Sequence, residues 1–409
     1  MKVWRLHNKA HQNIRQASTH WRHVDSPPPI PRQIFDNSAP PNAPVMTIDV
    51  NQNYQKFIVN GQIEYTTNAF EAKTNPGTVL KFDGELYELL KNPVADETFQ
   101  LMYQVKDCGF LQFREHFRPL LRNRNDSTHT RFLITGDRQC GKTLTCYALL
   151  LTFMKTKFPG VIIPALQLSH WFQDTTTSPL IYTPQGLLDF PEFNAEFLRF
   201  LVACNTYSES PNKDVLNNCV LKEDERWTSN MYSFKGESLL SAAKIGISTP
   251  PVASHVIQVL LSTILEDNIP SVVIADNANL LSEIHSSRLQ NLRDLKSKEW
   301  WDQPRLYPEN ITLLRNLKEF ITLHEKGKVY LTIDQRRNIG DQLVQETGNV
   351  PHRNVDIPNT PSPTEFLKFL NLMRKEEFIS RDLNSEQVTE LSYLTGRNYV
   401  DTFKYMFII

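Results

Sequence analysis

The sequence lacks several features that mark whole classes of proteins. No apolar run approaches the roughly 20 residues that a membrane-spanning helix requires, so we expect no such helix. It also lacks an excess of either charge, because 44 Lys and Arg residues and 45 Asp and Glu residues leave a formal net charge of −1. A protein that coats nucleic acid over its whole surface would be strongly basic. Any contact with RNA must therefore be local, and other proteins are the more natural main partners.

Cysteine is also scarce. The five cysteines stand at positions 108, 140, 146, 204 and 219, form no CxxC pair and are odd in number. This pattern excludes a disulfide framework and a zinc ribbon as the basis of the fold, and it is typical of a reducing compartment.

Acidic residues are missing from the first 24 positions, which carry five basic ones. A basic start without acids is typical of a mitochondrial transit peptide, and the alternative is a basic arm that lies on RNA or stays disordered. Prolines crowd the stretch from 27 to 44 and predict an extended linker, because proline fixes φ and removes a hydrogen-bond donor. We therefore predict an N-terminal extension over residues 1–45.

From Arg131 onward, short apolar runs alternate with helical patterns. Four runs that are apolar and partly β-branched predict buried strands, at residues 132–134, 161–163, 271–276 and 328–334. The first is followed by a helical pattern at residues 144–158. Strands that alternate with helices form a parallel sheet covered on both faces. The sequence therefore predicts an α/β fold.

A phosphate-binding motif lies between the first predicted strand and the first predicted helix. The segment Gly-Asp-Arg-Gln-Cys-Gly-Lys-Thr satisfies G-x-x-x-x-G-K-[ST] in the strand–loop–helix context that this motif requires. Its glycines allow a sharp turn and a close approach of backbone N–H groups to phosphates, its lysine binds the β and γ phosphates, and its threonine hydroxyl ligates Mg²⁺. We predict that the whole loop binds the nucleotide: Gly136, Asp137, Arg138, Gln139, Cys140, Gly141, Lys142 and Thr143.

Polar residues end two of the later predicted strands. Asp276 is predicted to hold Mg²⁺ together with Thr143, and the alternative is that it only caps the next helix. Asn277 follows, where many P-loop ATPases carry a glutamate that deprotonates the attacking water. Because an amide cannot take that proton, hydrolysis should be slow or depend on a group supplied elsewhere. Asp334 and Gln335 stand where such enzymes keep a sensor of the γ phosphate.

The rest of the chain divides around this core. Residues 46–125 have a mixed pattern of small hairpins and helices; within them, residues 110–124 predict an amphipathic helix, with RNA binding by its arginines as the alternative. We predict a nucleotide-binding domain at 126–340, with a helical insert at about 165–265, and a helical region at 341–409. The triplet Asn212-Lys213-Asp214 resembles the guanine-selecting motif N-K-x-D. It has neither the spacing of that motif nor a strand leading into it.

The motifs resemble those of the death-associated-protein family, the P-loop proteins of the mitochondrial ribosomal small subunit. The resemblance rests on residues 131–144, 272–281 and 328–335, on Arg118-Pro119 and on the segment that begins at Leu394. It implies an AAA-like P-loop core with bound GTP or GDP and Mg²⁺. It also implies a place in the mitochondrial matrix and contacts with ribosomal proteins, small-subunit rRNA and, at intersubunit bridges, large-subunit proteins. Asp137, Arg138 and Gln139 depart from the family by replacing smaller residues.

Three functions are compatible with these observations. The first is a structural component of the mitochondrial small subunit that keeps a bound nucleotide and turns it over slowly or not at all. The second is a GTPase or ATPase switch in ribosome assembly or translation, which Asn277 disfavours. The third is an apoptosis-type signalling ATPase, which the absence of a repeat array disfavours. The sequence does not distinguish guanine from adenine.

Overall fold

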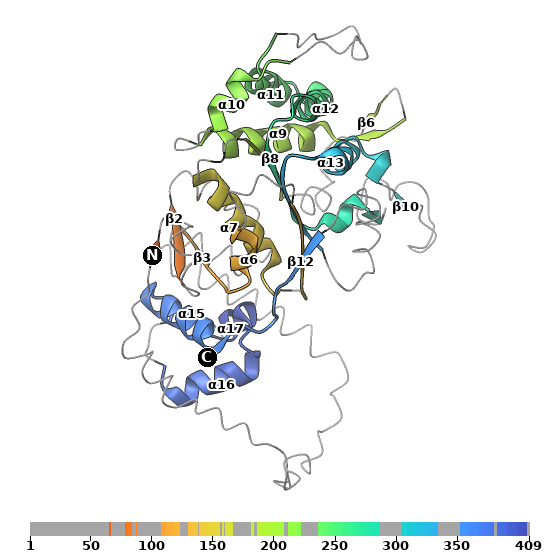
Figure 1. The fold of residues 1–409 in the computed structure, drawn as a ribbon. Helices are drawn as coiled ribbons and strands as arrows, with labels where there is room; N and C mark the ends of the chain where they lie inside the picture. Colours follow the sequence, from red (N-terminus) through yellow and green to blue (C-terminus); the bar gives the residue numbers. More distant parts are fainter. Residues whose placement is uncertain are drawn as a thin grey trace, which may run out of the picture. The chain divides into compact units, whose positions relative to one another are not determined.

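The fold is seen in a computed structural model (Figure 1). It describes residues 65–66, 78–83, 87, 108–122, 130–137, 139–155, 158, 160–166, 181–183, 186–207, 212–221, 236–282, 284–285, 305–306, 308–333, 352–379 and 383–406. The predicted N-terminal extension, Arg138 of the loop, and the sensor candidates Asp334 and Gln335 lie outside these residues. Within the described part, no helix combines the length and apolar character that crossing a membrane requires.

The centre of the fold is a five-stranded sheet in the order β12-β4-β11-β8-β5, in which every neighbouring pair is parallel. Its strands are β4 (Thr130–Thr135), β5 (Val161–Ala165), β8 (Ser271–Ala275), β11 (Gly327–Thr332) and β12 (His352–Asp356). The four predicted strands correspond to β4, β5, β8 and β11. The expected α/β class with a parallel sheet is therefore confirmed.

Both faces of the sheet are covered by helices, as the near-continuous apolar runs predict. Phe132 and Tyr330 stack with their ring centroids 4.9 Å apart, and Tyr330 also contacts Phe153 of helix α7 (Lys142–Lys155). The Tyr330 hydroxyl donates to the carbonyl of Leu120 in helix α6 (Phe117–Arg122) at 3.1 Å. Alternate residues of the same strands face the other way into a core shared with helices of the insert.

The insert is largely helical, as predicted (Figure 1). Its helices are α9 (Pro191–Thr206), α10 (Asn212–Asn218), α11 (Leu239–Ser248) and α12 (Pro250–Glu266), and α13 (Thr312–Leu323) packs against α12. Buried Asp189 joins three of them, because its carboxylate accepts hydrogen bonds from Asn194, Ser254 and Thr312 at 2.6, 3.1 and 2.5 Å. The triplet that begins at Asn212 opens a helix, so it does not form a base-selecting loop.

Short elements complete this part of the chain. They are β6 (Ile181–Tyr182), β7 (Leu188–Asp189), β9 (Ile284–His285), β10 (Arg305–Leu306) and the 3₁₀ turns η4 (Ala278–Leu281) and η8 (Pro308–Asn310). Strands β6 and β7 form one antiparallel pair, and β9 and β10 form another.

A second, smaller sheet precedes the central one, and it corrects one prediction. Strand β2 (Val79–Asp83) pairs in parallel with β1 (Tyr65–Thr66) and antiparallel with β3 (Cys108–Gln112). The helix predicted over residues 110–124 is therefore wrong in its first part. Pairing with β2 overrides the local helical pattern, and among the described residues of this range only those of α6 are helical.

Three helices follow the last strand of the central sheet: α15 (Pro363–Lys375), α16 (Ser385–Thr395) and α17 (Tyr399–Met406). Capping boxes at Ser362 and Asn384 begin the first two, since each side chain accepts a backbone N–H and the third helical residue reaches back. Gly396 ends α16 at φ 56°, a left-handed conformation that suits glycine. These helices agree with the helical region predicted at 341–409, but the same range also contains β12, which pairs with β4 and belongs to the central sheet.

Candidate functional site

The predicted phosphate loop turns from β4 into α7 through two glycines with positive φ. Gly136 has φ 147° and Gly141 has φ 103°. A Cβ atom at Gly136 would lie 2.6 Å from Cys140 Sγ and 2.9 Å from the carbonyl oxygen of Ile357, so no larger residue fits there. The motif glycines are thus required by backbone conformation and, at Gly136, also by space.

Lys142 lies across its own loop. Its ammonium group donates to the carbonyl oxygens of Gly136 and Asp137, each at 2.6 Å. The same helix terminus directs the positive end of the α7 dipole towards the loop. The Lys142 ammonium group and the backbone at the start of α7 therefore lie together where the motif predicts a bound phosphate.

The structure brings Asp276 to Thr143 at the C-terminal edge of the sheet. The Thr143 hydroxyl donates to Asp276 Oδ2 at 2.8 Å, and the Thr332 hydroxyl donates to Asp276 Oδ1 at 2.6 Å. Burial raises the pKa of the Asp276 carboxyl, and the hydrogen bonds from Thr332 and Thr143 oppose that shift. A hydroxyl and a carboxylate beside a phosphate loop fit Mg²⁺, which binds proteins through few side chains and keeps waters and phosphate oxygens as its other ligands.

Asn277 occupies a left-handed backbone position. Its φ is 55°, a region that asparagine adopts more readily than most residues, and its N–H donates to the Thr332 hydroxyl at 2.8 Å. Thr332 therefore holds both Asp276 and the next peptide in place. It ends β11, between the loop strand and the Asp276 strand, and its role was not expected from the sequence.

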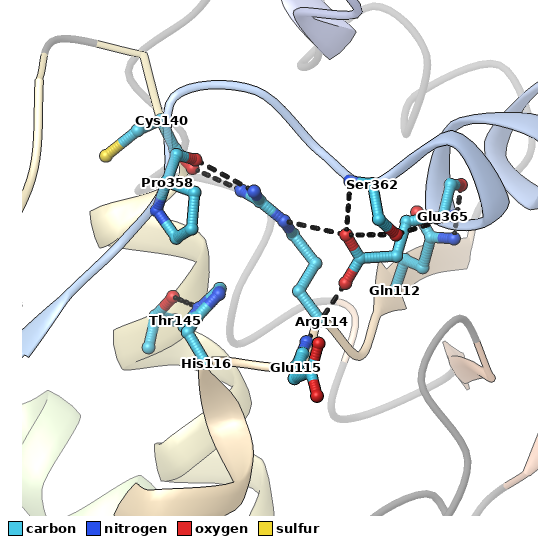
Figure 2. Close-up of polar contacts among 9 residues, drawn as sticks. All are labelled: Gln112, Arg114, Glu115, His116, Cys140, Thr145, Pro358, Ser362 and Glu365. Carbon is cyan, nitrogen blue, oxygen red and sulfur yellow. Dashed lines mark hydrogen bonds and ion pairs between the residues drawn. The ribbon is translucent and has the colours of Figure 1, made fainter. Parts of the chain in front are cut away.

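A second residue that sequence reasoning missed is Arg114, between β3 and α6. Figure 2 shows its guanidinium between Cys140 and Pro358 on one side and Glu365 on the other. It donates to the carbonyl oxygens of Cys140 and Pro358, each at 2.8 Å, and its Nε lies 3.9 Å from Glu365 Oε2. Arg114 thus faces inward, which argues against the RNA-binding alternative for this arginine. No local signal could reveal this contact, because Pro358 lies 244 residues away.

His116 stands beside the same loop. Its Nε2 lies 3.0 Å from the Thr145 hydroxyl, one turn into α7 (Figure 2). Burial, and secondarily the nearby charge of Arg114, lower the pKa of His116 to about 3. Its imidazole is therefore neutral at physiological pH and can act as a hydrogen-bond acceptor.

A cavity of about 80 Å³ opens between the loop and the C-terminal helices. It is lined by the segment from β3 to α6, by the loop and the first turns of α7, and by α15 and α17. Four lining residues carry buried polar atoms with no hydrogen-bond partner in the described part of the chain: Gln112 Oε1, Arg114 Nε, His116 Nδ1 and Tyr399 Oη. Buried polar atoms are normally paired, so the cavity suits a ligand with polar edges.

A model of the mitochondrial ribosomal death-associated protein 3 family matches residues 115–326, just over half of the chain. The matched region includes His116, the phosphate loop, Asp276 and the helical insert. A search of curated proteins found no match.

Proposed function

The chain belongs to the mitochondrial ribosomal death-associated protein 3 family, and from this membership we propose that it binds a nucleotide while serving in the mitochondrial ribosome. As a member, it is a component of the small ribosomal subunit in the mitochondrial matrix. We propose that it holds GTP or GDP with Mg²⁺ as a lasting constituent of its fold, with ATP as the alternative nucleotide.

The observation that carries this proposal is the geometry of the phosphate loop. Lys142 and the start of α7 supply positive charge, and the two glycines let the backbone approach an anion. Thr143 and Asp276 are the residues that would hold Mg²⁺. When bound there, the ion would neutralise charge on the phosphate oxygens.

The cavity beside the loop is the proposed place of the base. It adjoins Gly141 and Thr145, so a base in it would lie next to phosphates held by the loop. Three of its unpartnered atoms, on Gln112, His116 and Tyr399, could pair with the N–H and acceptor groups of a purine.

Slow turnover follows from Asn277. Its amide cannot accept a proton from an attacking water, and its left-handed φ of 55° would disfavour the glutamate that a faster enzyme places there. The structural-cofactor function is therefore preferred over a hydrolysis-driven switch. The proposed partners are neighbouring ribosomal proteins, small-subunit rRNA and large-subunit proteins at intersubunit bridges.

The proposal is tested by substituting Lys142. We expect Lys142→Ala to weaken binding of GTP with Mg²⁺ at least about tenfold, or roughly 1.4 kcal/mol, because the loop loses its point charge. Isothermal titration calorimetry measures the affinity. Lys155→Ala, at the far end of the same helix, is the matched control and should bind normally. Equal affinities of the Lys142→Ala and unmodified chains would refute phosphate binding by this loop.

A further inference from the structure

One buried cation connects the phosphate loop to a distant part of the chain. Arg114 and its partner Glu365 are almost fully enclosed, with 9% and 6% of their side chains exposed. The guanidinium joins Cys140 in the loop, Pro358 after β12 and Glu365 in the first turn of α15 (Figure 2). A planar group with several N–H donors can make these contacts together, whereas a lysine ammonium cannot reproduce that geometry.

The contact with Cys140 fixes the direction of a peptide that the loop needs. The carbonyl of Cys140 and the N–H of Gly141 belong to the same planar unit and point in opposite directions. Arg114 binds the carbonyl oxygen, and its Nη1 would lie 4.0 Å from a Cβ on Gly141. By holding the carbonyl on its own side, Arg114 keeps the Gly141 N–H turned to the opposite side. That N–H is one of the backbone donors that the motif offers to phosphate.

The other contacts tie the same cation to α15. Glu365 is the third residue of this helix and closes its capping box with Ser362. Its other oxygen accepts the N–H of Glu115 at 2.9 Å, so the carboxylate holds the Arg114 segment in two ways. The contact between Arg114 Nε and Glu365 is an ion pair at 3.9 Å, and removing either partner would leave the other charge buried without its counter-charge, which is costly.

Two further contacts join the chain after β12 to the loop. The carbonyl of Ile357 lies against Gly136, and the side-chain amide of Asn359 donates to the carboxylate of Asp137. The segment that leads into α15 therefore contacts the first two residues of the loop. If the loop changes its conformation when it binds a phosphate, the contacts with Ile357 and Asn359 must change as well. If these contacts do not change, they hold the loop in its present conformation.

We propose that Arg114 is a positioning residue that orients the phosphate loop and links its occupancy to helix α15. This inference rests on the proposed nucleotide binding and extends it, because it gives the bound nucleotide a route to the C-terminal helices. The link is the chain of contacts from Cys140 through Arg114 to Glu365.

The positioning role is tested with Arg114→Lys in the full chain. Because Arg114 also lines the cavity, the probe is inorganic triphosphate with Mg²⁺, which has no base. We expect Arg114→Lys to lower its affinity at least about tenfold, since a charge-assisted hydrogen bond to the loop is lost. Arg118→Lys is the matched control, because Arg118 is 40% exposed and its ion pair with Glu115 lies at the surface; it should change the affinity by less than roughly twofold.

Two results would overturn this role. One is unchanged triphosphate affinity in Arg114→Lys, and the other is a lower melting temperature without weaker binding, which would make Arg114 merely structural. If the unmodified chain binds neither GTP nor inorganic triphosphate, the proposed function itself fails. The two failures are thereby distinguishable.

The link to α15 is tested by hydrogen–deuterium exchange of peptides from residues 363–375, with and without triphosphate. We expect the ligand to slow exchange there in the unmodified chain. Glu365→Gln keeps a capping residue at the same position but removes the charge that pairs with Arg114, so the slowing should fall by at least about half. Glu376→Gln, at the other end of α15, should respond like the unmodified chain. An unmodified chain whose α15 does not respond, or a full response in Glu365→Gln, would overturn the link.

Discussion

At the scale of single residues, hydrogen bonds beside the phosphate loop determine which ring nitrogen of His116 carries the proton. The Thr145 hydroxyl donates to the Gly141 carbonyl at 3.0 Å, so its oxygen is left to accept the Nε2–H of His116. The tautomer with its proton on Nε2 makes one more hydrogen bond than the tautomer with its proton on Nδ1. It leaves Nδ1 without a partner as an acceptor and not as an N–H. Orphaned buried N–H groups are the rarer case. His116 Nδ1 therefore presents a lone pair, and a ligand in the cavity should offer it a donor.

The low pKa of His116, about 3, predicts a specific loss of stability in acid. The folded chain binds this proton more weakly than the unfolded chain, whose histidines titrate near 6.5. The contribution of His116 is thus fully present above pH 6.5 and is lost as the pH falls towards 3. Between pH 7 and pH 5 the loss should be about 2 kcal/mol.

The measurement is urea denaturation of the unmodified chain and of His116→Gln at both pH values. The variant should lose less stability than the unmodified chain over this interval. His255, whose pKa burial also lowers, remains in both proteins and contributes equally to each. Parallel pH profiles would contradict the assignment.

At the scale of elements, the side chain of Arg131 on β4 caps the C-terminal end of helix α13. Its side chain is fully buried on β4, and its Nη2 donates to the carbonyl oxygens of Ile321 and Thr322 at 2.7 and 3.2 Å. These carbonyls lie in the last turn of α13, where no intrahelical donor reaches them. The positive charge also suits the negative end of the helix dipole.

We expect Arg131→Met to lower the free energy of unfolding by about 2–3 kcal/mol, because it leaves buried carbonyls without their donor. Arg315→Met, an exposed change on α13 itself, is the control and should stay within about 0.5 kcal/mol. Denaturant titration measures both values. Similar losses in the two variants would show that the cap contributes little.

Elements whose cause is local could be predicted from the sequence. The strands β4, β5, β8 and β11 are buried parallel strands, and such strands read as apolar runs. Strand β12 has no such signal, because only Val355 of His352–Asp356 is buried. It is a strand only because β4, more than 200 residues earlier, offers it hydrogen bonds.

The candidate site divides in the same way. The phosphate loop is a contiguous motif whose glycines, lysine and threonine reveal their roles by spacing, and a strand-end aspartate is also recognisable. The cavity and the Arg114 network are assembled from three segments that the chain brings together only on folding. A sequence pattern carries no record of such contacts, so Arg114, His116 and Thr332 could not be identified beforehand.

At the scale of the whole molecule, the proposed cofactor role predicts a defect in ribosome assembly. The loop contacts the segment that leads to α15, so a chain that cannot hold nucleotide should present its C-terminal surface in altered positions. Lys142→Ala should therefore enter mitochondrial small subunits poorly and remain at the top of a sucrose gradient. Lys155→Ala should sediment with the subunit. Normal incorporation of a Lys142→Ala chain proven free of nucleotide would reject a structural cofactor and favour a switch.

The position of β4 in the sheet has a consequence for how the protein is made. All six of its residues are buried, yet its neighbours β11 and β12 lie far downstream, and Thr135 meets Asp356 across 221 residues. At roughly 5–20 residues per second, a ribosome needs on the order of 10–45 s to supply that length. During this time β4 lacks its two neighbouring strands and exposes an apolar edge that can pair with other chains. A ligand of the phosphate loop can therefore secure a nearly finished fold, but it cannot start one.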